Sequence, residues 1–477
     1  MDQTFLFVDG FETGKAARQR IRSHVMNGKN AGKKVHRRSR LGLMPSTPYY
    51  RRYRTSEQCD SHNVDRESGM SQGLPCPLTN SRILGDPFRT LSYPVEPTSY
   101  SLDIFNEFFS HVINKFYPCH LGISPDDAKY WWLQLSLADE AAYHCMIAVT
   151  DACIHFFRGG GASTREALYH RSRTLTLVTE RLAGDDALSD STISLVVMMI
   201  VQEQIRRGVP EAHIHYEGLR KMIEIRGGIS QLEQSPTLLL KICKMDNIYA
   251  WQYGRPISFF RDCMPEARAR LESEGLPFDL SLAESVAPPH KLNSCLREIL
   301  LDVINVSVLF NRIPPTTRLN YITFAELVHS ICYRLIKFQP LHEPSSLSDL
   351  EDVYHMALTV FMMTLFMKFD DQRLLRCEAV FERLRTILRR NLAELDTDLV
   401  LWMLFIGGIW IRNGPDDSWL YTKIRKLTRS MGLDSWEEIY PVISVFPWIK
   451  SLHNGPGVAL WDSVYELSRV GDRKLLP

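Results

Sequence analysis

Apolar residues recur at helical spacing from Ser101 to the end of the chain, and this periodicity limits the fold more than any other feature. One such series, ended by Gly432, is Leu420, Ile424, Leu427 and Met431. Residues three and four apart lie on one face of a helix, whereas a half-buried strand needs strict alternation. Alternation is nearly absent here. The sequence therefore predicts an all-α body over residues 100–477, a large irregular domain of many helices.

Helix boundaries can be predicted at several places. Ser235 is the predicted N-cap of a helix whose first position is Pro236. Ser435 and Glu438 have the spacing of a capping box. Two further helices, one after Thr164 and one late in the body, have apolar faces that we expect to point into the core. These faces are Leu168, Leu175, Val178 and Leu182, and Cys377, Phe381, Leu384 and Leu388.

Two long apolar runs, residues 356–367 and 399–411, contain no charged residue. Both are shorter than the roughly 20 residues that a membrane-spanning helix needs. The N-terminus has an acid at position 2 and no basic stretch before its first apolar patch, unlike a secretory signal. We expect buried core helices and no membrane association.

Charge is unevenly distributed along the chain. Residues 13–56 contain 13 Lys or Arg and no Asp or Glu, whereas the whole chain has 56 basic and 55 acidic residues. Outside this run the balance is 43 minus 55, or −12. A basic arm (1–56) attached to an acidic body is typical of a nuclear import signal or of a segment that binds a polyanion.

The part of the basic arm with the most closely spaced Lys and Arg is where we expect contacts with nucleic acid or with the import machinery. Closely spaced Lys and Arg attract phosphate through counterion release and need no fixed fold. Three readings stay open: nuclear import alone, import with non-specific nucleic-acid contact, or a largely disordered tail without either role. The predicted import and nucleic-acid contact residues are Lys33, Lys34, Arg37, Arg38, Arg40, Arg51, Arg52 and Arg54.

A groove-reading element is the alternative to contact with phosphate alone. Lys15–Met26 can form one amphipathic helix with Arg18 and Arg22 four residues apart, and Gly28 ends it. Sequence-specific reading of DNA requires an element that fits a groove, so Arg18 and Arg22 are the candidate groove contacts.

The segment between the arm and the body, residues 57–99, is rich in Pro, Ser, Thr and Asn. Such a composition predicts a linker with little fixed structure. The predicted organisation is therefore a basic arm (1–56), a linker (57–99) and a helical body (100–477).

Motifs for chemistry are lacking. No two of the ten cysteines are separated by two residues, so no zinc-cluster spacing occurs. His213 and His215 point in nearly opposite directions on a helix, and only His213 and Glu217 share a face. The glycine triplet at residues 159–161 lacks the flanking residues of a phosphate-binding loop. We expect no metal, no cofactor and no catalytic residue.

Two stretches resemble the fungal-specific transcription factor domain family. The first comprises residues 215–228 (HYEGLRKMIEIRGG), Leu232 and residues 245–251 (MDNIYAW). The second comprises residues 401–409 (LWMLFIGGI), 418–421 (SWLY) and 433–439 (LDSWEEI). Together they bracket about residues 100–465. Within them, we expect Gly227 and Gly228 to end a helix at a sharp turn, and Gly407 and Gly408 to permit close approach of helices.

The resemblance implies a nuclear regulator of transcription. In this family a binuclear zinc cluster with six cysteines usually precedes the helical domain, whereas here Phe5–Val8 and Arg18–Met26 look like the opening of members without it. The implied partners are other transcription regulators or nuclear proteins, with non-specific DNA contact through the arm; a homodimer stays open. We expect a protein-interaction or effector-sensing body. The alternatives are an interaction scaffold outside transcription and an enzyme whose site is dispersed over the helices.

Overall fold

The structure is a computed structural model that confirms the all-α prediction. It describes residues 87–113, 121, 125–160, 163–279, 292–314, 317–366, 377–411 and 418–473. Every regular element within these ranges is a helix, and none is a β-strand. Residues 86–477 form one compact unit. The basic arm and the linker up to residue 86 lie outside the described residues, as does the predicted Lys15–Met26 helix.

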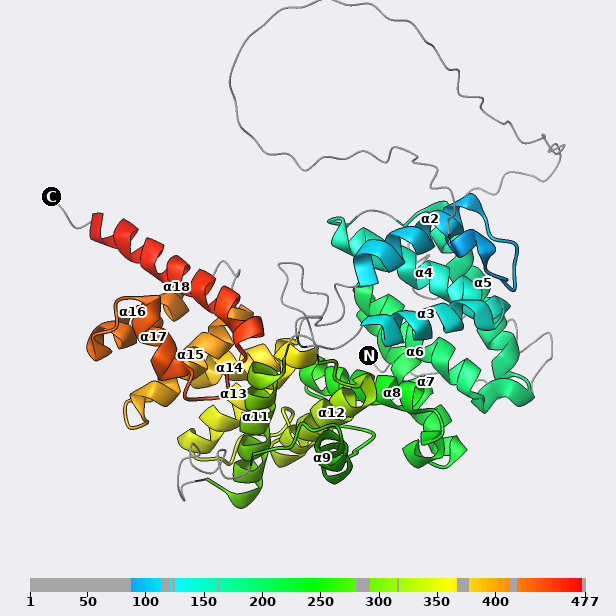
Figure 1. Ribbon diagram of the computed structural model, residues 1–477. Coiled ribbons are helices and arrows are strands. Elements are labelled where there is room, and N and C mark those ends of the chain that lie inside the picture. The colour runs from blue at the N-terminus through cyan, green and yellow to red at the C-terminus, as the bar shows by residue number, and fades with distance from the viewer. Residues whose placement is uncertain are drawn as a thin grey trace, which may run out of the picture. The chain divides into compact units, whose positions relative to one another are not determined.

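The N-terminal helices of the body pack around α4 (Glu140–Phe157), shown in cyan in Figure 1. This helix is buried from Ala141 through Ile154, because neighbours cover it on all sides. The Asp139 carboxylate caps it by accepting the N–H of Ala142 at 2.9 Å. The elements on α4 are α2 (Ser99–Glu107), the π-helix η2 (Phe108–Val112), α3 (Pro125–Ala138), α5 (Arg165–Leu182) and α6 (Asp190–Ile205).

A second core lies between α6, α7 (Val209–Arg226) and α8 (Pro236–Tyr253). Two glycines end α7 in backbone conformations that favour glycine, since φ is 104° at Gly227 and 101° at Gly228. The chain thereby turns into the short 3₁₀ helix η6 (Ile229–Leu232) and enters α8. The predicted sharp turn at this pair is confirmed.

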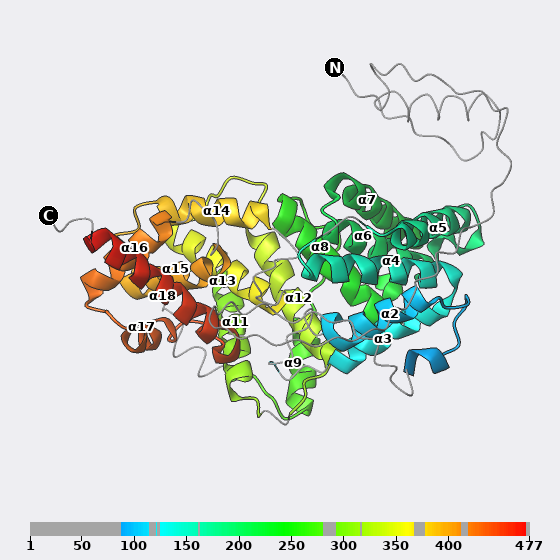
Figure 2. The same cartoon turned by 90° about the horizontal axis from the view of Figure 1, so that it is seen from above.

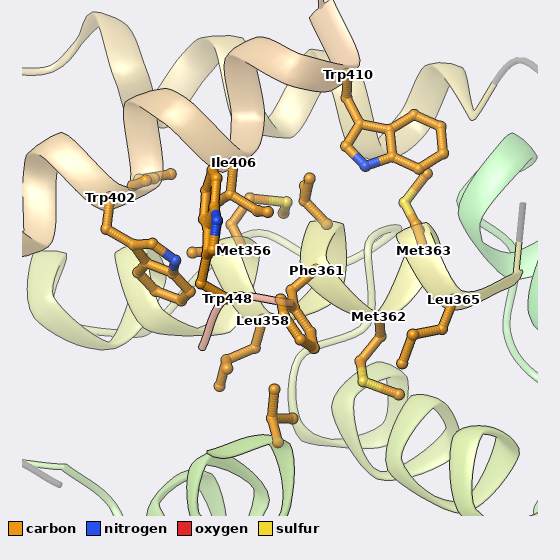
Figure 3. Close-up of a cluster of buried hydrophobic side chains, with 14 of the residues drawn as sticks. Met356, Leu358, Phe361, Met362, Met363, Leu365, Trp402, Ile406, Trp410 and Trp448 are labelled. Carbon is orange, nitrogen blue, oxygen red and sulfur yellow. The ribbon is translucent and has the colours of Figure 1, made fainter. Parts of the chain in front are cut away.

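The third and largest core lies around α13 (Asp349–Phe366) and α15 (Thr397–Ile411), whose apolar side chains face each other in Figure 3. The two apolar runs form the buried parts of these helices, as predicted. No helix in the described ranges is long and apolar enough to cross a membrane. The helices that follow α8 are α9 (Met264–Ser273), α11 (Ser294–Arg312), α12 (Tyr321–Phe338), α13 (Asp349–Phe366), α14 (Glu378–Arg389), α15 (Thr397–Ile411), α16 (Ser418–Met431), α17 (Trp436–Ile443) and α18 (Lys450–Arg473).

Most of the predicted helix boundaries and faces are confirmed. The capping box at Ser435 is present in both directions with Glu438. The helix predicted to begin at Pro236 does so, although the Ser235 hydroxyl donates to Asp190 and does not cap the helix. The series on α14 from Cys377 to Leu388 is buried, and α16 packs its own series on the third core.

The predicted apolar face of α5 is wrong. Leu168, Leu175 and Leu182 are 47%, 40% and 47% exposed. The buried side instead consists of Ala167, His170, Thr174 and Val178. Polar residues can occupy it because the His170 and His144 Nδ1 atoms lie 2.8 Å apart in a hydrogen bond, and the Thr174 hydroxyl donates to the His170 carbonyl at 2.9 Å.

The end of the predicted linker packs on the body. Residues 87–90 form the short 3₁₀ helix η1 (Pro87–Thr90). The Phe88 and Tyr93 rings lie 6.3 Å and 6.0 Å from the Phe105 ring of α2. The Tyr93 hydroxyl donates to the Phe88 carbonyl at 2.9 Å. Through these aromatic contacts, Phe88 and Tyr93 pack against the core around α4.

Helices pack closely at several glycines, because a glycine has no side chain to keep them apart. A Cβ on Gly408 of α15 would lie 2.6 Å from Cδ2 of Leu460, and one on Gly407 would lie 3.2 Å from Cδ2 of Leu384. In α18, a Cβ on Gly457 would lie 2.6 Å from Cη2 of Trp436. The predicted close approach at the 407–408 pair is confirmed, and α18 needs a similar one.

We expect Gly457→Ala to lower the free energy of unfolding by about 1–3 kcal/mol, because its methyl group would overlap Trp436 and also lie 3.2 Å from the Trp448 ring. Gly218→Ala on α7 is the control, since no described group lies within 4 Å of its Cβ position. Gly218→Ala should raise the free energy of unfolding by ~0.5–1 kcal/mol, because alanine has a higher helix propensity than glycine. Urea denaturation of both variants measures the difference, and equal stabilities would contradict this account.

Candidate functional site

The residues predicted to make import or nucleic-acid contacts all lie in the basic arm. Neither the cluster from Lys33 to Arg54 nor the groove candidates Arg18 and Arg22 fall within the described residues. Their contacts stay a prediction. Within the described body, the segment that carries the first family resemblance contains a buried polar network.

Asp246 on α8 is the central polar residue of that segment. Its carboxylate is fully buried and accepts four hydrogen bonds. The Tyr216 hydroxyl and the Ser258 N–H donate to Oδ1 at 2.5 and 2.8 Å, and the Phe259 N–H and the Tyr333 hydroxyl donate to Oδ2 at 2.9 and 3.0 Å. Burial raises the pKa of this carboxyl, while the donors act in the opposite direction.

These four bonds join α8 to three other segments of the chain. Tyr216 comes from α7, Tyr333 from α12, and residues 258–259 from the loop before α9. The Tyr216 ring also stacks on Tyr249 with the ring centroids 4.0 Å apart. All four hydrogen bonds come from the protein itself, so the Asp246 carboxylate holds helices together and is not directed at a ligand.

Lys241 occupies a different face of α8, where it meets α3. Its Nζ atom lies 3.9 Å from the centroid of the Trp131 ring and 5.7 Å from that of Trp132. No carboxylate among the described residues lies within ion-pair distance of it. Burial, and then the positive charge of Lys244, lower the pKa of Lys241 from 10.5 to about 7. The aromatic rings offset part of this cost through cation–π attraction.

This arrangement leaves a partly buried ammonium group without an anion. Lys244, one helical turn further along α8, has a pKa lowered to about 8 by burial. Both groups can therefore change charge near neutral pH, and an anion bound beside them would favour their protonated forms. The sequence signal for this pair was two lysines inside an otherwise apolar helix.

One cavity of about 460 Å³ opens between the loop after α9 and the end of α11. Its polar residues include Asp279 and Arg312, whose closest charged atoms lie 3.9 Å apart. A volume of this size is within the range of small-molecule pockets. It is lined by residues 275–279 together with Asn305, Val308, Leu309, Arg312 and Ile313.

The His213 and Glu217 pair on α7 does share a face, with His213 Nδ1 4.0 Å from Glu217 Oε1. Burial lowers the pKa of His215, which lies on another side of the helix. Within the described ranges, no three His, Cys, Asp or Glu residues are placed to hold a metal ion.

One comparison with known proteins finds a match. Residues 100–249 match the family model of the fungal specific transcription factor domain. This match confirms the resemblance for the segment from α2 into α8, which contains Tyr216, Lys241 and Asp246. Neither a curated protein nor a solved structure matches the chain.

The first of the two resembling stretches lies mainly within the matched residues, and the second lies beyond them. The match supports a role in transcription regulation, which implies the nucleus. The resemblance of residues 401–439 stays a prediction.

Lys241 gives a pH-dependent prediction. Because the pKa of Lys241 is lower in the folded than in the unfolded chain, its side chain is protonated only in the unfolded chain between about pH 7 and 10.5. Its destabilising effect on the fold is therefore largest at pH 7 and below, and it falls as the pH rises. Lys241→Met removes the cost of the buried charge. We expect this variant to be more stable than the parent at pH 7 and below, and the difference to shrink toward pH 10.

Urea denaturation between pH 6 and 10 measures this difference. Lys221→Met on the exposed side of α7 is the matched control, and its effect should be within about 0.5 kcal/mol at each pH. A difference between Lys241→Met and the parent that stays constant over the range would show that Lys241 titrates alike in both states.

Proposed function

We propose that this protein is a nuclear transcription regulator whose helical body contacts other nuclear proteins or senses an effector, and whose basic arm contacts DNA. The match of residues 100–249 to the fungal specific transcription factor domain carries this proposal. The second support is the separation of charge, with 13 basic residues and no acid over residues 13–56. We further propose that the chain acts without a zinc cluster, since its cysteines lack the ligand spacing.

The arm and the body have different roles in this proposal. Phosphate attracts the arm at any DNA sequence, since counterion release depends on charge and not on base identity. The rest of the chain has a formal balance of 43 minus 55, or −12, so it does not add to this attraction. Selection of target genes then depends on the proteins that the body contacts.

Effector sensing has two candidate locations in the body. The cavity of about 460 Å³ beside α11 offers Asp279 and Arg312 to a small polar molecule. The ammonium of Lys241 beside Trp131 offers a positive charge next to an aromatic surface. Both lie outside the Asp246 network, whose hydrogen bonds hold α7, α8 and α12 together.

The arm provides the test of this proposal. Replacing Lys33, Lys34, Arg37, Arg38 and Arg40 with Ala should abolish nuclear accumulation and weaken binding to every DNA duplex to a similar extent. The reason is that these five residues form the densest part of a run without acids. The dependence of binding on salt should become less steep, because fewer counterions are released. Microscopy of the tagged protein and binding titrations at several salt concentrations measure both effects.

A charge-matched control removes five exposed cations from the body, where no loss of import or DNA affinity is expected. These are Arg158, Arg220, Lys221, Arg318 and Lys426. If import and DNA affinity at low salt are unchanged in the arm variant, the arm has neither role. If Arg18→Ala or Arg22→Ala instead costs about 1–3 kcal/mol at one preferred sequence only, the arm reads a groove.

A further inference from the structure

The outward side of α5 is an apolar surface. Leu168, Leu175 and Leu182 are spaced seven residues apart and are 40–47% exposed. The opposite side of the helix packs on α4 and α6, so the leucines cannot turn inward without removing His170 and Val178 from the core. Figure 2 shows α5 at the edge of the group of helices formed by α4, α6 and α7.

Hydroxyl residues lie next to the row of leucines. The other exposed positions from Leu168 to Leu182 are Tyr169, Ser172, Thr176, Thr179 and Glu180. Glu180 is the charged residue among them, and it lies on the far side of Thr176 from the leucines. The Thr176 hydroxyl donates to the Ser172 carbonyl at 3.1 Å, and the Thr179 hydroxyl donates to the Leu175 carbonyl at 2.7 Å. Because both threonine hydroxyls are already bonded within the helix, covering them costs little desolvation.

The outward residues form two parallel rows of different size. One row is Leu168, Leu175 and Leu182, and the neighbouring row is Ser172 and Thr179. A second identical helix running antiparallel would place two leucines of one row against the small row of its neighbour, Leu168 against Thr179 and Leu175 against Ser172, and would place Leu182 against the stem of Arg165. A parallel pair would place leucines against leucines and leave space between the small residues.

Charges at the two ends of α5 also favour the antiparallel arrangement. Arg165 begins the helix, Asp185 and Asp186 follow its end, and all three are exposed. No ion pair is formed by any of them with another described residue. In an antiparallel pair, Arg165 of one copy would lie beside the two aspartates of the other, twice by symmetry. In a parallel pair, like charges would meet.

We propose that α5 is a homodimer interface, in which it packs antiparallel against α5 of a second copy of this chain about a two-fold axis near Ser172 and Leu175. An 18-residue helix is about 27 Å long, at 1.5 Å per residue. One helix pair of this length forms an interface at the small end of stable ones, so we expect a weak, reversible dimer. This inference goes beyond the proposed function, because the dimer forms whether or not the chain regulates transcription.

The oligomeric state of the full chain is the first test. Sedimentation equilibrium from about 1 to 100 μM should show a reversible dimer. Leu175→Glu places two like charges at the centre of the interface and should shift the dissociation constant at least tenfold upward. Ile225→Glu is the matched control, since Ile225 is an exposed apolar residue (61%) on the neighbouring helix α7. It should leave the dimer unchanged, and circular dichroism should show that both variants are folded.

The direction of packing is tested by disulfide crosslinking. Leu168→Cys and Thr179→Cys are made in separate chains, and the chains are oxidised alone and mixed. Antiparallel packing predicts disulfide-linked dimers in the mixture only, whereas parallel packing predicts them in each chain alone. The background chain has serine at the native cysteines outside the buried set, which are Cys59, Cys76, Cys119, Cys263 and Cys295.

A charge reversal tests the ends of the interface. Arg165→Asp should weaken the dimer several-fold, and so should Asp185→Arg with Asp186→Arg. All three changes in one chain should restore it, because opposite charges meet again. The proposal is overturned if the parent chain is monomeric at 100 μM, if Ile225→Glu dissociates the dimer and Leu175→Glu does not, or if each cysteine variant crosslinks to itself.

Discussion

A buried carboxylate on α8 holds the body together, because three other segments depend on it for their hydrogen-bonding partners. Asp246 accepts bonds from Tyr216, Tyr333 and two backbone N–H groups of residues 258–259. Without the carboxylate, the buried N–H of Phe259 would lose its acceptor, at a cost of about 1–3 kcal/mol, and the two tyrosine hydroxyls would keep only Ser258 and the Cys243 carbonyl as partners. Its position fixes where α7 and α12 meet α8, and it therefore determines how the second core is joined to the helices that follow.

The same helix separates two cores. One side of α8 packs in the second core through residues such as Ile242 and Tyr249, whereas Ala250 and Trp251 near its end pack in the third. Its remaining polar side places Lys241 against Trp131. A ligand or partner that moves α8 would therefore displace both cores, which gives the matched domain a physical route for transmitting a binding event.

The sequence predicted those elements whose apolar residues do the packing. The series on α14 and α16, the capping box at Ser435 and the turn at Gly227 follow from spacing and from local backbone chemistry. The face of α5 could not be predicted in this way, because its buried side is occupied by His170, whose partner His144 lies 26 residues away. Asp246 was missed for a similar reason, since its four donors come from segments distant in the sequence. The residues of the basic arm lie outside the described residues, and their role stays a prediction.

We propose that the basic arm and the helical body act together on chromatin. Chromatin occupancy of the intact protein, compared with a chain lacking residues 1–60 that is imported by an added signal, tests it most directly. The account predicts discrete occupied sites near genes whose transcripts change on deletion of the protein, and a general fall in occupancy without the arm. Absence of occupancy by the intact protein, together with unchanged transcripts on deletion, would contradict it.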